Sequence, residues 1–109
     1  MSTPARTLIT EPANTKLISP ASYWELAIKV SLGKYILRES YDELIQHAIV
    51  DNGFGILPVE PRHPAALITL PHHHKDPFDR LMVAQALVES IPLVSGDAVL
   101  DQYPITRLC

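Results

Sequence analysis

Three acidic residues stand beside apolar, strand-like segments of the sequence. They are Glu25, Asp79 and Asp97. Carboxylates gathered in one place repel one another, so a protein that collects three of them must protonate one or supply a cation. Mg²⁺ and Mn²⁺ are hard ions that prefer oxygen ligands and keep several waters for a substrate and a nucleophile. The three acids therefore predict a site for a divalent metal ion.

The segment around Asp79 carries a specific pattern of helix-start residues. It reads HHHKDPFDRLMVAQA over residues 72–86. Asp76 is a favourable N-cap and Pro77 suits the first helical position. Asp79 then falls in the first turn, where a carboxylate lies well against the helix dipole. We therefore expect a helix from Asp76 to about Glu89.

Each of the three acids also has a purely structural explanation. Glu25 could simply close a capping box with Ser22. Asp79 could have no role other than to complement the helix dipole. Asp97, after Gly96, could be a turn residue or the cap of a following short helix. Capping and metal binding are compatible, because a site at a strand end would use residues at the start of the next helix.

The histidines and aromatic residues near these acids receive other interpretations. Three adjacent histidines at 72–74 lack the spacing and the Cys partners of a structural zinc site, so we do not expect zinc there. Asp76 is expected to be a cap and not a ligand. Because Trp24, Phe54 and Phe78 stand in periodic apolar runs, we expect them in the core.

Short helices and short strands alternate along the chain. Helices are predicted over residues 4–9, from Ser22 to Gly33, from Ser40 to about Asn52, over 63–70 and from Asp76, and strands at 17–18, 54–59, 91–95 and 105–108. This alternation indicates an α/β fold with a parallel sheet covered on both faces. A ligand site is then expected beyond the carboxyl ends of the strands.

Composition limits the class of protein. With 109 residues the chain is expected to form a single domain over residues 1–109. No apolar run approaches the roughly 20 residues that cross a bilayer, and no secretory signal is recognisable, so we expect a cytoplasmic protein without membrane contact. One cysteine, Cys109, excludes an intrachain disulfide and fits a reducing compartment.

The formal net charge of −3 argues against a large basic surface for nucleic acid. Overall charge therefore neither requires nor excludes an RNA substrate. Any basic contacts would have to be local, with Lys29, Lys34, Arg38, Lys75 and Arg80 as the candidates.

Three motifs, in order along the chain, resemble those of a known nuclease family. They are SYWELAIK at 22–29, HHKDPFDRLMVAQA at 73–86 and LVSGD at 93–97. As a set they resemble the PIN-domain ribonucleases, specifically the VapC-type toxins of bacterial type II toxin–antitoxin systems, over about residues 4–108. The resemblance implies a PIN-like three-layer α/β/α fold and a metal-dependent endoribonuclease that hydrolyses RNA phosphodiester bonds.

The resemblance also implies roles for particular residues and partners. Glu25, Asp79 and Asp97 match the family's second, third and fourth acidic positions and would hold Mg²⁺ or Mn²⁺. Ser95 matches the supporting hydroxyl residue beside the last acid. For the three histidines at 72–74 the resemblance implies a substrate or surface role. The implied partners are a cognate antitoxin, a second copy in a homodimer, and RNA of the tRNA or rRNA class. A DNA substrate is not expected.

The start of the chain departs from the family's pattern. The family opens with a hydrophobic strand that ends in an aspartate, whereas this chain begins MSTPAR, which is typical of a helix capped by Ser2 or Thr3. The only acid before Glu25 is Glu11, beside Pro12 in an expected turn. We therefore expect an N-terminally truncated domain without the first strand and the first catalytic aspartate.

Two further hypotheses stay open at this point. The first is a catalytically impaired PIN remnant that binds an antitoxin without cutting RNA, because one of four acidic ligands is missing. The second is an unrelated α/β phosphate-binding module, which the absence of a Gly-rich loop disfavours.

Overall fold

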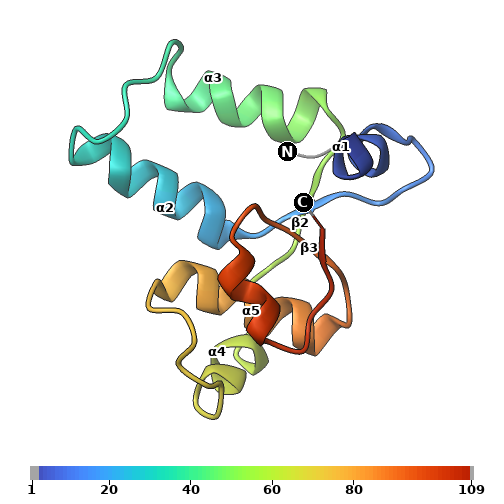
Figure 1. The fold of residues 1–109 in the computed structure, drawn as a ribbon. Helices are drawn as coiled ribbons and strands as arrows, with labels where there is room; N and C mark the ends of the chain where they lie inside the picture. Colours follow the sequence, from blue (N-terminus) through green and yellow to red (C-terminus); the bar gives the residue numbers. More distant parts are fainter. Residues whose placement is uncertain (1–2, 109) are drawn as a thin grey trace. The chain divides into compact units, whose positions relative to one another are not determined.

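Helices and two-residue parallel strands alternate along residues 3–108, the part of the chain that the computed structural model describes (Figure 1). The chain divides into two units, Met1–Asn14 with Val59–Cys109 and Thr15–Pro58. Ser2 and Cys109, which entered the sequence analysis, lie outside the described residues. No helix in residues 3–108 is long and apolar enough to span a membrane.

The unit Thr15–Pro58 pairs two short strands and carries two helical segments. Its elements are β1 (Leu17–Ile18), α2 (Pro20–Ser31), α3 (Tyr41–Ile45), the π-helix η1 (Gln46–Asp51) and β2 (Gly55–Ile56). β1 and β2 are parallel, with Leu17 opposite Gly55. The helix predicted from Ser40 is confirmed, because the Ser40 hydroxyl accepts a hydrogen bond from the Glu43 N–H at 3.2 Å.

The start of α2 differs from the prediction. The helix begins at Pro20, and the Oγ of Ser19 accepts a hydrogen bond from the Ala21 N–H at 3.2 Å. Ser19 followed by Pro20 is a stronger start signal than Ser22, because proline is pre-set for the first helical position. The capping box expected between Ser22 and Glu25 was therefore wrong, and both residues lie inside the helix.

The aromatic residues expected in the core are not buried there. Trp24 is 60% exposed, so its expected core position was wrong, and Phe54 and Phe78 are only half-buried. Ala21 is the one buried residue of α2. Two strands of two residues each offer little surface against which a helix of 12 residues could bury an apolar face.

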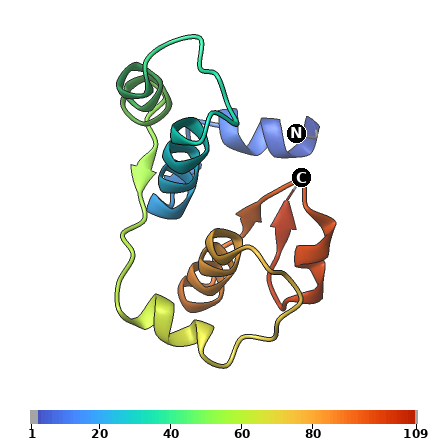
Figure 2. The ribbon, with the colours of Figure 1, turned by 90° about the vertical axis from the view of Figure 1, so that its left-hand side faces the viewer.

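The other unit contains the remaining elements and an apolar core. They are α1 (Thr3–Thr10), α4 (Arg62–Leu67), α5 (Pro77–Glu89), β3 (Leu93–Val94), the 3₁₀-helix η2 (Ala98–Gln102) and β4 (Arg107–Leu108). Figure 2 shows β3 and β4 side by side next to α5. The core consists of Leu70, Val83, Leu100 and Tyr103. The helix predicted at the start of the chain is confirmed, although Thr3 already belongs to it.

The helix α5 has the predicted start. Asp76 is its N-cap, and Oδ1 of Asp76 accepts hydrogen bonds from the N–H groups of Phe78 at 2.8 Å and Asp79 at 3.2 Å. Pro77 is the first helical residue. The helix ends at Ser90, which has a left-handed backbone conformation with φ 55°.

The strands are parallel, as predicted, but within residues 3–108 they form two separate two-stranded sheets and not one. The strand expected over residues 91–95 is shorter in the structure, because Pro92 has no N–H to donate. The first hydrogen bond of this strand runs from the Leu93 N–H to the Thr106 carbonyl, at 2.9 Å. Among the described residues, no strand joins the two sheets. The α/β class is confirmed, with small parallel sheets.

Candidate metal centre

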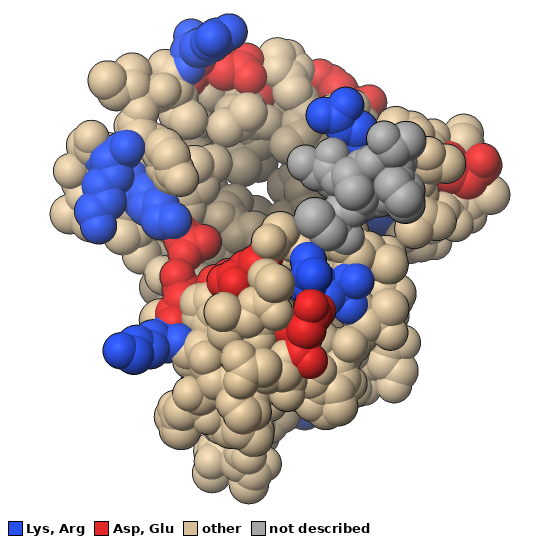
Figure 3. Space-filling view, viewed as in Figure 1, with Lys and Arg blue, Asp and Glu red and all other residues tan. Residues whose placement is uncertain are grey.

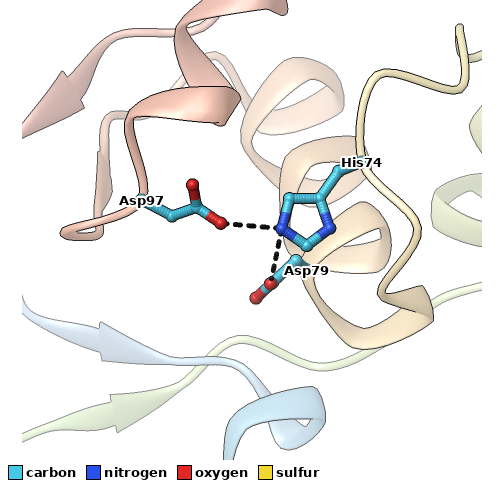
Figure 4. A group of neighbouring side chains, drawn as sticks. All are labelled: His74, Asp79 and Asp97. Carbon is cyan, nitrogen blue, oxygen red and sulfur yellow. Dashed lines mark hydrogen bonds and ion pairs between the residues drawn. The ribbon is translucent and has the colours of Figure 1, made fainter.

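The side chains of His74, Asp79 and Asp97 meet within one unit (Figure 4). One potential ligand atom of each lies within 4.8 Å of those of the other two. Nε2 of His74 is 2.7 Å from Oδ2 of Asp97 and 3.3 Å from Oδ2 of Asp79. All three side chains are partly buried, so the group is accessible from solvent. The structure therefore brings together two of the three acids that the sequence singled out.

Asp97 is both a helix cap and a member of the cluster. It lies three residues after the end of β3 and is the N-cap of η2, where its Oδ1 accepts a hydrogen bond from the Val99 N–H at 3.0 Å. This hydrogen bond is the main cause that holds the pKa of Asp97 below its usual range, and the hydrogen bond from His74 is the second. The carboxylate is therefore ionised at neutral pH. The structural explanation given for Asp97 holds, and Oδ2 still faces the cluster.

Ser95, the expected supporting residue, lies directly beside Asp97. Its hydroxyl oxygen accepts a hydrogen bond from the Asp97 N–H at 3.1 Å. Its backbone N–H donates to the Leu108 carbonyl at 2.9 Å, which continues the ladder between β3 and β4. Ser95 therefore connects the end of the sheet to the loop that carries Asp97.

A buried network fixes the loop that carries His74. Arg80 is 8% exposed, and its guanidinium donates to the carbonyl oxygens of Pro71 at 2.8 Å and Leu70 at 3.2 Å. The Tyr103 hydroxyl donates to the Pro71 carbonyl at 2.7 Å and accepts from the His74 N–H at 3.0 Å. Arg80 was considered for local RNA contacts, and that interpretation was wrong because its guanidinium is buried among carbonyl groups.

Glu25 lies on α2, in the unit Thr15–Pro58. Its Oε2 forms an ion pair with Nζ of Lys29 at 3.8 Å, one helical turn further along. The side chain is partly buried. A shared site with Asp79 and Asp97 stays a prediction for this residue.

An open pocket of about 400 Å³ adjoins the cluster. Its lining consists of Leu67, His72, His74, Lys75, Pro77 and Arg80. His72 and Lys75 are exposed and give this pocket polar and cationic groups beside His74. Figure 3 shows the Lys and Arg side chains of one face as separate groups, several of them next to Asp or Glu.

His74 is the member of the cluster that the sequence analysis did not single out. The expectation was only a substrate or surface role for residues 72–74. A signal was present, because His74 stands two residues before the N-cap Asp76 and can turn back over the first helical turn, where Asp79 lies. His72 lines the pocket, and the ring of His73 packs edge-on against Tyr103 with 5.1 Å between centroids.

The donor chemistry fits a divalent metal ion. Two carboxylates supply the oxygen ligands that Mg²⁺ and Mn²⁺ prefer, and an imidazole within the same group is compatible with Mn²⁺. Fewer than four protein ligands leave positions for water and substrate. The arrangement can therefore support hydrolysis of a phosphate ester.

Comparison with known proteins gives one match. The sequence model of the PIN domain family matches residues 2–105. Neither the curated proteins nor the solved structures gave a match.

Proposed function

Because the chain belongs to the PIN domain family, we propose that it is a metal-dependent endoribonuclease and the VapC-type toxin of a type II toxin–antitoxin system. PIN domains are generally nucleases, are often part of toxin–antitoxin systems and use divalent metal ions. The observation that carries the proposal is the meeting of Asp79 and Asp97, from the first turn of α5 and from the loop after β3. An unrelated phosphate-binding module is excluded by the family match.

Asp79 and Asp97 would hold Mg²⁺ or Mn²⁺, with Glu25 as the third carboxylate and Ser95 in support. When bound, the ion would activate a water for in-line attack on the RNA phosphodiester and stabilise the leaving oxygen. The chain's own residues keep the carboxylates of Asp79 and Asp97 in place. Asp97 is held by the Val99 N–H, and Asp79 by its position in a capped first turn.

The pocket beside His74 supports contact with the RNA backbone. His72 and Lys75 present polar and cationic groups there, and phosphate oxygens accept hydrogen bonds from such side chains. We propose RNA of the tRNA or rRNA class as the substrate. The metal site would then lie at one end of the bound segment and the pocket would hold the neighbouring nucleotide.

Exposed apolar side chains support the proposal of protein partners. Trp24, Leu32, Tyr35 and Ile36 are all exposed in the unit Thr15–Pro58, and Ile36 is 95% exposed. Leu32, Tyr35 and Ile36 lie within five residues of one another, and apolar surface that is exposed and contiguous commonly marks an interaction site. We propose the cognate antitoxin and a second copy of the chain as partners, with the cytoplasm as the location.

A catalytically impaired PIN remnant that binds antitoxin is the second candidate. It is favoured by α1, because residues 3–10 are helical where the resemblance leads us to expect a strand with the first aspartate. The two candidates differ in RNA cleavage and share the metal centre.

Calorimetric titration with Mn²⁺ tests the metal centre. We expect Asp79→Asn and Asp97→Asn each to weaken Mn²⁺ binding by roughly tenfold or more, since each removes a charged oxygen ligand. Asparagine is also a good N-cap, so Asp97→Asn should keep η2 folded. Asp51→Asn, which changes an exposed acid on η1, is the matched control and should bind Mn²⁺ like the parent.

Cleavage of RNA by the parent separates the two candidates. Metal-dependent cleavage that Asp79→Asn abolishes supports the ribonuclease, whereas Mn²⁺ binding without cleavage supports the remnant. Equal Mn²⁺ affinities for the parent and both substituted chains would contradict the proposed metal centre.

A further inference from the structure

We propose that His74 is a positioning residue that donates a hydrogen bond from Nε2 to the carboxylate of Asp97, next to the carboxylate of Asp79, and that it does not ligate the metal ion. In the ion-free protein this N–H takes the place of the cation between the two carboxylates, and a binding ion must displace it. The inference rests on the proposed metal centre and assigns a role to a residue outside its acidic ligands.

The hydrogen bond at the other ring nitrogen fixes the position of the proton. The backbone N–H of Asp76 points at Nδ1 of His74 with an N···N distance of 3.0 Å. A backbone N–H can only donate, so Nδ1 must accept and carries no hydrogen. The neutral imidazole has one N–H group, and in His74 this group is therefore on Nε2.

The Nε2–H of His74 is donated to Asp97 and lies near Asp79. Its nitrogen is 2.7 Å from Oδ2 of Asp97, which accepts the hydrogen bond, and 3.3 Å from Oδ2 of Asp79 (Figure 4). A hydrogen bond from N–H to a carboxylate is charge-assisted and stronger than one between neutral groups. The donor therefore offsets part of the repulsion between two carboxylates that lie close together.

A metal-ligating histidine has the opposite arrangement. Such a residue offers a lone pair to the ion and donates its other ring N–H to a carboxylate, a carbonyl or a water. In His74 the other ring nitrogen faces the N–H of Asp76, which cannot accept a hydrogen bond. Nε2 could bind an ion only if the ring changed its tautomer and lost the contact with Asp76.

The surroundings hold the ring in this state. Asp76 is the N-cap of α5, so the position of its N–H is fixed by the helix start. The backbone N–H of His74 donates to the Tyr103 hydroxyl at 3.0 Å, and Tyr103 is a buried core residue. The contact with the capped helix therefore sets the tautomer, and the core holds the backbone from which the ring extends.

Long-range proton–nitrogen NMR spectra of the ¹⁵N-labelled, ion-free chain test the tautomer directly. We expect the His74 ring, identified by the loss of its signals in His74→Gln, to carry its proton on Nε2 and none on Nδ1. A proton on Nδ1 with a bare Nε2 would overturn the proposal. This measurement uses the unsubstituted chain and needs no metal ion.

Titration with Mn²⁺ tests the displacement. His74→Ala should bind Mn²⁺ roughly three- to tenfold more tightly than the parent, because the ion no longer competes with a charge-assisted hydrogen bond. His47→Ala, which changes an exposed histidine on η1 outside the cluster, is the matched control and should leave the affinity unchanged. Unchanged or weaker binding by His74→Ala would show that His74 does not compete with the ion.

Pulsed EPR of bound Mn²⁺ separates a ligand from a neighbour. We expect no nitrogen coupling of the size given by a coordinated imidazole, and such a coupling that disappears in His74→Ala would overturn the proposal. If Asp79→Asn binds Mn²⁺ as tightly as the parent, the proposed metal centre fails. The tautomer measured in the ion-free chain still decides the role of His74.

Discussion

Arg80 and Tyr103 donate hydrogen bonds to the same acceptor, the carbonyl oxygen of Pro71, at 2.8 and 2.7 Å. Both side chains are buried. Arg80 comes from α5, and Tyr103 directly follows η2. The loop between α4 and α5 is therefore held by two elements that are distant in sequence, and this loop carries His74.

Removal of the Tyr103 hydroxyl should destabilise the chain. We expect Tyr103→Phe to lower the free energy of unfolding by roughly 1–3 kcal/mol, because the ring stays but buried polar groups lose a partner. Urea denaturation measures the difference. Tyr35→Phe, at an exposed position, is the control and should change stability by less than about 0.5 kcal/mol. Equal losses in the two variants would argue against the network.

The role of Glu25 is open to a direct test. If Glu25 is the third carboxylate of the proposed metal centre, Glu25→Gln should weaken Mn²⁺ binding severalfold, because an amide oxygen carries no charge. Calorimetry measures the affinity, and Glu43→Gln on α3 is a control for loss of one acidic charge. An unchanged affinity would mean that Glu25 serves only its helix, through the ion pair with Lys29.

The ion pair between Asp101 and Arg107 should make stability depend on acid pH. The guanidinium of Arg107 donates to both carboxylate oxygens, at 2.7 and 3.0 Å, and these hydrogen bonds hold the pKa of Asp101 below its usual range. A lowered folded-state pKa stabilises the fold above the unfolded-state value of about 3.9. That contribution is lost as the pH falls through the folded-state pKa.

Denaturation of the parent and Asp101→Asn at several pH values checks this relationship. The parent should be the more stable chain at neutral pH, and the difference should shrink below about pH 4. A difference that stays constant down to strongly acidic pH would assign the effect of the substitution to something other than the charge of Asp101.

The exposed apolar group of the unit Thr15–Pro58 should govern self-association. We expect Ile36→Ser to weaken dimerisation measured by analytical ultracentrifugation, because Ile36 is almost fully exposed close to Leu32 and Tyr35 in sequence. Ile68→Ser changes an equally apolar, exposed residue of the other unit and is the control. A larger effect of Ile68→Ser would move the proposed contact surface to that unit.

Local signals predicted the elements that position the acids. The sequence Asp76-Pro77 and the residue Ser40 mark helix starts through hydrogen bonds within three residues, so no distant contact was needed to predict them. The meeting of Asp79 with Asp97 agrees with the expectation that ligand sites lie beyond the ends of parallel strands.

Other features depend on contacts that a local pattern does not contain. The periodicity around Trp24 defines a helix face, but it does not say whether another element covers that face. The tautomer of His74 depends on a cap two residues away, and the position of its backbone depends on Tyr103, which is 29 residues away. A local sequence pattern can contain the contact with the nearby cap, but it cannot contain the contact with the distant Tyr103.

The left-handed backbone at the end of α5 has a consequence for engineering. Ser90 caps this helix with φ 55°, a conformation that only glycine adopts without a steric penalty. The Ser90 side chain is therefore strained in this conformation, and the strain lowers the free energy of unfolding by about 1 kcal/mol. Ser90→Gly would release this strain at the opposite end of the helix from Asp79, and so raise the melting temperature without altering the cluster of His74, Asp79 and Asp97.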